Sequence, residues 1–196
     1  MRSENPRIDD PLLNQRVHEL LDMLAQPGPA PAGGSAAALA IAMGAGLVAM
    51  AARISVDDWD EAATTAAQAE ALRRRAAPLA HADAEAYAEV LRLRRERASD
   101  EELGRAFERA AELPLMIAEV GADVAELAAR AAPRVDPKVQ GDAAAAAVLA
   151  EAGTRIAAHL VGINLATSEG DERIRRAREL AEAATGASRR SVAAEG

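Results

Sequence analysis

The sequence predicts an all-α fold, and three observations lead to this prediction. Ala, Leu, Arg and Glu, which are strong helix formers, dominate the composition. Aromatic residues make up only 2% of the chain, so a β-sandwich or barrel would lack the side chains that its strands require. Apolar residues recur every three or four positions, as they do on the buried face of a helix. We therefore expect a single-domain bundle of about six helices, two of them kinked at proline.

The stretch from Pro29 to Arg53 is expected to be the central helix of this bundle. Its prolines and Gly33-Gly34 predict a turn, after which Ser35 is expected to be the helix N-cap. The following residues, 36–52, carry no charge, and most of them are Ala or Gly, so neighbouring backbones can approach closely, with Gly46 as the expected point of contact. The stretch is long enough to cross a membrane, but Ala and Gly contribute little to insertion. We expect no membrane partner.

Five further helices follow from the apolar periods and from cap and proline signals. They are expected from Asp10-Pro11 to Leu24, from about Trp59 to Arg97 with a bend at Pro78, from a Ser99 capping box to Ala132 with a bend at Pro114, along the seam Leu149–Ile163, and from the Ser168–Asp171 cap onward.

Length and charge set the expected organisation. The 196 residues fit one domain over residues 10–186, between flexible ends at residues 1–9 and 187–196. A formal charge of −8 argues against nucleic acid as a partner. The chain has no cysteine, and His18 and His81 lack metal-ligand spacing, so no metal site is expected. The first twenty residues lack the apolar core of a signal peptide, which makes the cytoplasm the expected location.

Asp83 is the first candidate for chemistry. It falls in line with Leu79 and Val90, on a helix face that should be buried. A buried carboxylate without a partner either costs several kcal/mol or takes up a proton. Asp83 is therefore expected to pair with an arginine of another helix, to leave the buried face because the apolar seam rotates at the Pro78 bend, or to serve a function.

Three polar residues of the helix that ends near residue 164 are further candidates. Asp142 falls on the inner seam but could equally be an N-cap. Asn164 lies on the same seam, and His159 is one position off it. At about 1.5 Å per residue, Asp142 and Asn164 are about 33 Å apart along the helix. They serve different sites, or an antiparallel second subunit brings the two ends together.

The turn at Gly33-Gly34-Ser35 is the last candidate site. It presents free backbone amides at the positive end of a helix dipole. Such a place can bind a carboxylate or phosphate group of a ligand.

These stretches, taken in order, resemble the formiminotransferase-cyclodeaminase C-terminal domain and the single-domain methenyltetrahydrofolate cyclohydrolases. The matching segments span about Val17 to Ala184 and are the Pro29-x-Pro31-x-Gly33-Gly34-Ser35 turn, Asp83-Ala-Glu-Ala-Tyr87, Leu113-Pro-Leu-Met-Ile-Ala-Glu119, Gly141-Asp142 through Glu151, and Ile163-Asn164-Leu165.

The resemblance implies an all-α, antiparallel homodimer that acts on one-carbon tetrahydrofolates and needs no other cofactor. The implied reaction is hydrolysis of 5,10-methenyltetrahydrofolate to 10-formyltetrahydrofolate, or loss of ammonia from 5-formiminotetrahydrofolate with ring closure. Asp83 and Asp142 would be the catalytic carboxylates. The implied substrate-binding residues are Gly33, Gly34, Ser35, Tyr87, His159 and Asn164.

The sequence departs from the family pattern at several places. Ala32 replaces the first glycine of the turn, and Ile54-Ser-Val-Asp57 replaces a Thr-x-Gly-Lys segment whose lysine is expected near the anionic ligand. Gln140-Gly141 precedes Asp142, and His159 stands where an asparagine is typical. The alternative is therefore a catalytically altered relative that serves as a folate-binding or scaffold dimer.

Overall fold

The structure is a computed structural model that describes residues 12–27, 31–165 and 170–194, and within these ranges it contains helices and no strand. The expected all-α class is confirmed. The expected helix start at Asp10-Pro11, the turn residue Pro29 and the cap residue Ser168 lie outside the described residues. The helices are α1 (Val17–Ala25), α2 (Gly33–Ile54), α3 (Ala62–Ala76), α4 (Leu79–Glu96), α5 (Asp100–Ala131), the short 3-10 helix η1 (Pro137–Val139), α6 (Gln140–Asn164) and α7 (Glu172–Ala193).

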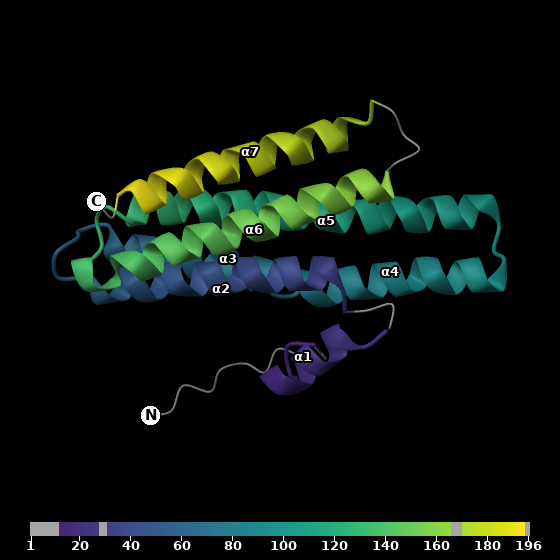
Figure 1. The fold of residues 1–196 in the computed structure, drawn as a ribbon, viewed down its shortest axis with the longest axis horizontal. Helices are drawn as coiled ribbons and strands as arrows, with labels where there is room; N and C mark the ends of the chain where they lie inside the picture. Colours follow the sequence, from purple (N-terminus) through teal and green to yellow (C-terminus); the bar gives the residue numbers. More distant parts are fainter. Residues whose placement is uncertain (1–11, 28–30, 166–169, 195–196) are drawn as a thin grey trace.

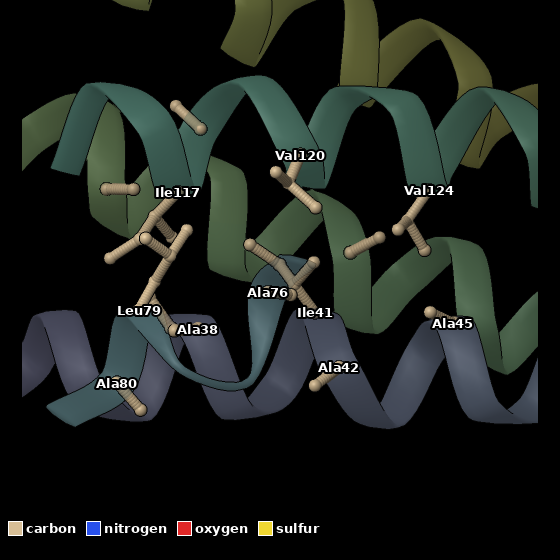
Figure 2. Packing of buried hydrophobic residues seen from close by; sticks show 14 of the residues in the cluster. Ala38, Ile41, Ala42, Ala45, Ala76, Leu79, Ala80, Ile117, Val120 and Val124 are labelled. Carbon is tan, nitrogen blue, oxygen red and sulfur yellow. The ribbon is translucent and has the colours of Figure 1, made fainter. Parts of the chain in front are cut away.

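Helix α2 lies at the centre of an elongated bundle, as its composition predicts. It packs against α3, α4, α5 and α6, while α7 lies over α5 and α6 (Figure 1). Of its most apolar 18-residue window, 61% is buried. Small side chains allow the helices to approach closely, and the few larger ones fill the spaces between backbones. The Ile41 side chain of α2 points toward α5, and Leu79 of α4 lies beside Ile117 of α5 (Figure 2).

Two glycines of the core allow backbones to touch. A Cβ on Gly44 would lie 2.8 Å from the carbonyl oxygen of Ala146, and one on Gly153 would lie 2.8 Å from that of Ala37. A Cβ on Gly46 would meet only the Arg73 side chain, at an ordinary 3.8 Å. The expectation that Gly46 is the point of close approach is therefore wrong, because α2 turns Gly44 toward α6.

Helices α2 and α6 run antiparallel. Gly44 touches Ala146, whereas Gly33, near the start of α2, faces Ile156 and Leu160 near the end of α6. At the opposite end of the pair, the Asp136 amide donates to the Ser55 hydroxyl at 2.8 Å. The first turn of α2 therefore lies beside the last turns of α6, and the first turn of α6 lies at the far end of the bundle.

The two internal prolines act differently. The helix expected over residues 59–97 is divided at Ala77-Pro78 into α3 and α4, and both residues keep right-handed helical angles, so the chain bends without leaving the bundle. Helix α5 continues through a buried Pro114. The Ser99 capping box that starts α5 is confirmed, with the Ser99 hydroxyl accepting from the Glu102 amide.

The C-terminal end is more ordered than its polar sequence predicts. Asp171 is the N-cap of α7, and its side chain accepts a hydrogen bond from the Arg173 amide. The helix continues to Ala193. Ala187, Ser188 and Ser191 are buried. Helix α7 therefore includes residues up to Ala193 of the tail expected from residue 187, and small residues on one of its faces pack against α5 and α6.

Candidate active site

The first turn of α2 forms one wall of the site. Its N-cap is Ala32, whose extended backbone precedes the helix, and no side chain caps the first amides. Ser35 is buried within this turn, and its hydroxyl donates to the carbonyl oxygen of Ala80 at 2.7 Å. The expectation that Ser35 is the N-cap is therefore wrong. Its hydroxyl instead fixes α2 to the start of α4, which places Asp83 beside the turn.

The Asp83 carboxylate packs directly on Gly34. A Cβ on Gly34 would lie 2.2 Å from Asp83 Oδ2 and 2.4 Å from both Oδ1 and Cγ. No side chain larger than hydrogen fits at position 34 while Asp83 holds this position. Gly34 is thus required by the close approach of another residue.

Asp83 has no charged partner among the described residues. Its side chain is half-buried, and the structure gives it no ion pair or hydrogen bond within the described residues. Burial without compensation raises the pKa of Asp83 to about 6. Of the outcomes that the sequence left open, pairing with an arginine is excluded within the described residues, and the raised pKa of the half-buried carboxyl group shows that Asp83 does not turn fully into solvent.

An open hollow lies on the other side of the turn. A Cβ on Gly33 would lie 4.0 Å from Ile156 Cγ2 and from Leu160 Cδ1. These two side chains, together with Ala152, Arg155, His159 and Ala181, line a hollow of about 600 Å³ between α6 and α7. Its size suits a small heterocyclic ligand, and Arg155 adds a cationic side chain to walls that are otherwise mostly apolar. Sequence reasoning missed Ile156 and Leu160 as site residues, because only the α2–α6 packing brings them to Gly33.

Tyr87 and Asn164 lie at the edges of this region. Tyr87 is one helical turn after Asp83 on α4, and its side chain is 43% exposed, so its ring is available to a ligand. Asn164 is half-buried at the end of α6, where its Nδ2 donates to the carbonyl oxygen of Ala110. This bond anchors α6 to α5 and leaves the Asn164 side-chain oxygen as its remaining polar atom.

Asp142 is not brought to this site within one chain. It lies in the first turn of α6, at the opposite end of the bundle, and the N-cap there is Val139, so the N-cap interpretation of Asp142 is wrong. From Ile156, which faces Gly33, Asp142 is about 21 Å away along the helix at about 1.5 Å per residue. One chain therefore provides Asp83 and the glycine turn without a second carboxylate.

A larger hollow of about 870 Å³ between α4 and α5 does not contain Asp83. Its walls carry charged side chains of both signs: Arg92 bonds to Glu89 and Glu96, and Arg105 bonds to Glu101, whereas Arg95 and Arg109 make no ion pair within the described residues. It contains no carboxyl group with a raised pKa among the described residues. We therefore place the candidate site at the glycine turn.

The arrangement at the turn can move protons near neutral pH. A carboxyl group with a pKa of about 6 is a base when ionised and an acid when protonated, and both forms are populated close to pH 6. Free amides at the start of α2 lie next to it and can stabilise a partial negative charge. The fold and the site together define an all-α bundle with a half-buried carboxylate of raised pKa at a helix N-terminus.

Comparison with known proteins places this bundle in a family. A model of the formiminotransferase-cyclodeaminase family matches residues 16–183. The chain belongs to that family. Formiminotetrahydrofolate cyclodeaminase from Thermotoga maritima has a similar structure, with a TM-score of 0.85 and 24% sequence identity over 93% of this chain and 96% of that one. No curated protein sequence matches the chain.

Proposed function

We propose that this protein is a one-carbon folate enzyme that acts on the carbon between N5 and N10 of tetrahydrofolate. It hydrolyses 5,10-methenyltetrahydrofolate to 10-formyltetrahydrofolate, or it releases ammonia from 5-formiminotetrahydrofolate with ring closure. One observation carries the proposal: the Asp83 carboxylate, without a cationic partner and with its pKa raised to about 6, packs on the glycine turn of a chain of the formiminotransferase-cyclodeaminase family.

In the hydrolysis, Asp83 is the general base. Water adds to the bridge carbon of the methenyl cation, and Asp83 accepts its proton. The remaining hydroxyl group loses its proton as the bond between the carbon and N5 breaks, and N5 takes up a proton, so one proton is released overall. The ionised carboxylate also stabilises the positive charge of the bridge before water adds, because no arginine or lysine of the described residues neutralises Asp83.

In the deamination, the same carboxyl group moves a proton between two nitrogens. N10 attacks the carbon of the protonated formimino group and gives up its proton to Asp83. Asp83 returns a proton to the former imino nitrogen, which leaves as ammonia while the methenyl bridge forms. Both reactions therefore need one group beside the tetrahedral bridge carbon that can both accept and donate a proton, which requires a pKa near the working pH.

The remaining residues hold the folate. The free amides of Gly33 and Gly34 face a polar group of the ligand, the Ile156–Leu160 hollow takes an apolar ring surface, and Tyr87 provides an exposed aromatic face. We further infer that the protein acts in the cytoplasm as a homodimer, with the folate as its substrate and no additional cofactor.

The test measures loss of the methenyl chromophore with purified protein, for the wild type and for Asp83→Asn. Asp58→Asn, a substitution at an exposed carboxylate in the turn before α3, is the matched control. We expect hydrolysis by the wild type and by the control, and a loss of at least about 100-fold in the Asp83 variant. Ammonia release from 5-formiminotetrahydrofolate is measured in parallel and assigns the reaction.

A second candidate function is a folate-binding or scaffold dimer without turnover. The observation that favours it is the end of α2, where Ile54 is exposed and an acidic residue, Asp57, replaces the lysine that the family pattern places near the ligand. Folate binding by calorimetry without turnover of either substrate would support this candidate over the enzyme.

A further inference from the structure

A groove runs between α3 and α5, and it consists of two hollows. The hollow at Trp59 has a volume of about 190 Å³, and the hollow at Arg75 has a volume of about 410 Å³. Gln68 of α3 and Leu127 and Arg130 of α5 line both hollows, so the two are continuous. We call this feature the α3–α5 groove.

The floor of the α3–α5 groove is apolar. Leu127 is 4% exposed and belongs to a cluster of the core, and the half-buried side chains of Leu72 and Trp59 pack against the same cluster. Ala71 of α3 also lines the groove and is exposed, and its small side chain leaves the space above Leu72 open. These side chains can contact the hydrocarbon part of a ligand and remove it from water.

The Trp59 end of the groove carries two arginines without a counterion. Arg130 and Arg134 line this hollow, and neither forms an ion pair within the described residues. The Arg134 guanidinium donates to the Arg130 carbonyl oxygen at 2.9 Å, which holds it at the end of α5. Glu61 is the acidic residue among those that line the hollow, and it accepts from the Trp59 indole at 3.3 Å. The two guanidinium groups therefore remain available to an anion.

The opposite end of the groove has no such excess of charge. Arg75 of α3 is paired with Asp123 of α5, with 3.6 Å between the nitrogen and the oxygen. Glu126, which also lines this hollow, is paired with Arg190 of α7. The groove therefore has one cationic end and one end at which the charges are compensated.

Thr65 adds a hydroxyl group without a partner to the cationic end. The residue is 7% exposed and lines the hollow at Trp59. The buried hydroxyl of Thr154 donates to the carbonyl oxygen of Ala150, four residues back, at 2.7 Å. The Thr65 hydroxyl makes no such bond within the part of the chain that the structure describes, and its oxygen is not fully enclosed, so it opens into the hollow. A hydroxyl in this position favours a ligand atom that can accept its hydrogen bond.

We propose that the α3–α5 groove binds an amphipathic carboxylate, a small molecule with one carboxylate group and an unbranched hydrocarbon chain. The carboxylate lies between Arg130 and Arg134 and accepts from the Thr65 hydroxyl. The chain lies over Leu72 and Leu127 and runs toward the compensated end of the groove. Both parts are needed, because exposed arginines alone bind an anion weakly and an apolar floor alone does not orient a ligand.

The dimensions of the groove set the length of the chain. From Gln68, which lines both hollows, to Arg75 at the compensated end, α3 rises by about 10 Å, the length of an extended chain of about eight carbon atoms. The groove is separate from the site at Asp83, because α2 begins at the glycine turn and ends near Trp59, about 30 Å away along its axis. The inference therefore does not rest on the proposed function.

Trp59 makes binding measurable, because it is the only tryptophan of the chain and lines the groove. Purified protein is titrated with octanoate while the emission of Trp59 is recorded. We expect a saturable change with a dissociation constant below about 1 mM. The neutral 1-octanol has the same chain and should bind at least about tenfold more weakly, and acetate, which has the charge without the chain, should not displace octanoate at equal concentration. Equal affinity for octanoate and 1-octanol, or no saturable change up to about 10 mM octanoate, overturns the proposal.

The cationic end is tested by Arg130→Gln and Arg134→Gln combined in one protein. We expect the affinity for octanoate to fall at least about tenfold, while the affinity for 1-octanol stays unchanged. The matched control combines Arg178→Gln and Arg189→Gln, which removes two exposed arginines of α7 that make no ion pair within the described ranges. An equal loss in the control would show that octanoate responds only to the total charge of the protein, and it would overturn the assigned position of the carboxylate.

The apolar part of the groove is tested by Ala71→Phe. Ala71 is exposed, so the larger side chain fills the groove without entering the core. We expect at least about a tenfold loss of octanoate affinity, because the phenyl ring takes the place of the chain. Ala67→Phe, at an exposed position of α3 that does not line the groove, is the control, and thermal unfolding checks that both variants fold. Unchanged affinity in Ala71→Phe overturns the proposal, and so does a change in the sedimentation of that variant, which would indicate a protein as the occupant.

Discussion

The carboxylate of Asp83 occupies the space that a side chain on Gly34 would need. A Cβ at position 34 would lie 2.2 Å from Asp83 Oδ2, closer than unbonded atoms approach. The relationship links two residues 49 positions apart in the sequence. It explains why a glycine follows Gly33 at the start of α2, and it ties the position of the candidate base to the backbone of another helix.

Substitution of Gly34 by alanine should therefore remove activity without unfolding the protein. The added methyl group forces the short Asp83 side chain to another rotamer, away from the turn. We expect turnover of the methenyl substrate to fall by at least about tenfold, because a base must lie within hydrogen-bond distance of the proton that it accepts. Gly104→Ala is the control, since a Cβ there meets nothing within 4 Å. Equal turnover by both variants would contradict the assigned position of Asp83.

The rate of hydrolysis should depend on pH through Asp83. The carboxyl group has its pKa raised to about 6 by burial, and only its ionised form accepts a proton from water. We expect kcat/KM for the methenyl substrate, corrected for the uncatalysed reaction, to be constant above about pH 7 and to fall about tenfold per pH unit below pH 6. The residual kcat/KM of Asp83→Asn should not fall in this way below pH 6. An inflection near pH 4 would show instead that Asp83 is solvated.

The raised pKa of Asp83 should lower the free energy of unfolding at neutral and alkaline pH, where the carboxyl group is ionised. The folded state favours the protonated carboxyl group, so the free energy of unfolding of the wild type falls as pH rises from about 4 to above 6. Asp83→Asn avoids this loss. We expect the variant to be about 1 to 2 kcal/mol more stable at pH 8, a value reduced for the partial exposure of the side chain, and to approach the wild type near pH 4. Urea unfolding at both pH values measures the difference, and a variant less stable at pH 8 would contradict it.

Two buried serines should respond to alanine with opposite signs. The Ser35 hydroxyl donates to the Ala80 carbonyl, whereas the Ser191 hydroxyl is buried and has no hydrogen-bond partner among the described residues. Ser35→Ala leaves a buried carbonyl oxygen without this donor, and we expect it to destabilise the protein by about 1 to 2 kcal/mol. Ser191→Ala removes an unpaired polar atom and should be neutral or stabilising. Thermal unfolding of both variants measures the two changes in stability. Equal melting temperatures for the two variants would contradict the prediction.

Two glycines of α2 should also differ in their tolerance of alanine. A Cβ on Gly44 would press on the backbone of α6 at Ala146, and the helices would have to separate. We expect Gly44→Ala to cost about 2 to 3 kcal/mol. Gly46→Ala makes only an ordinary contact, with Arg73, and should stabilise the helix by up to about 1 kcal/mol. Denaturation curves of similar midpoint for the two variants would show that α2 and α6 are not in contact at Gly44.

The class of fold, the position of the central helix and the placement of Asp83 on a largely apolar helix face could be predicted from the sequence. These follow from local properties: helix-forming residues, apolar spacing, and a carboxylate placed in an apolar stripe. The Ser99 capping box was also predictable, since its two hydrogen bonds join Ser99 and Glu102 within one turn of the chain.

Only the tertiary structure decided which residues meet. The local pattern predicted Ser35 as an N-cap and Gly46 as a contact point. The rotation of α2 about its axis instead directs the Ser35 hydroxyl to the Ala80 carbonyl and places Gly44 against α6. Ile156 and Leu160 reach the site, and Asp142 does not reach it within one chain, because α2 and α6 run in opposite directions. The relative direction and rotation of two helices depend on how their whole surfaces fit, and spacing along one helix does not specify that fit.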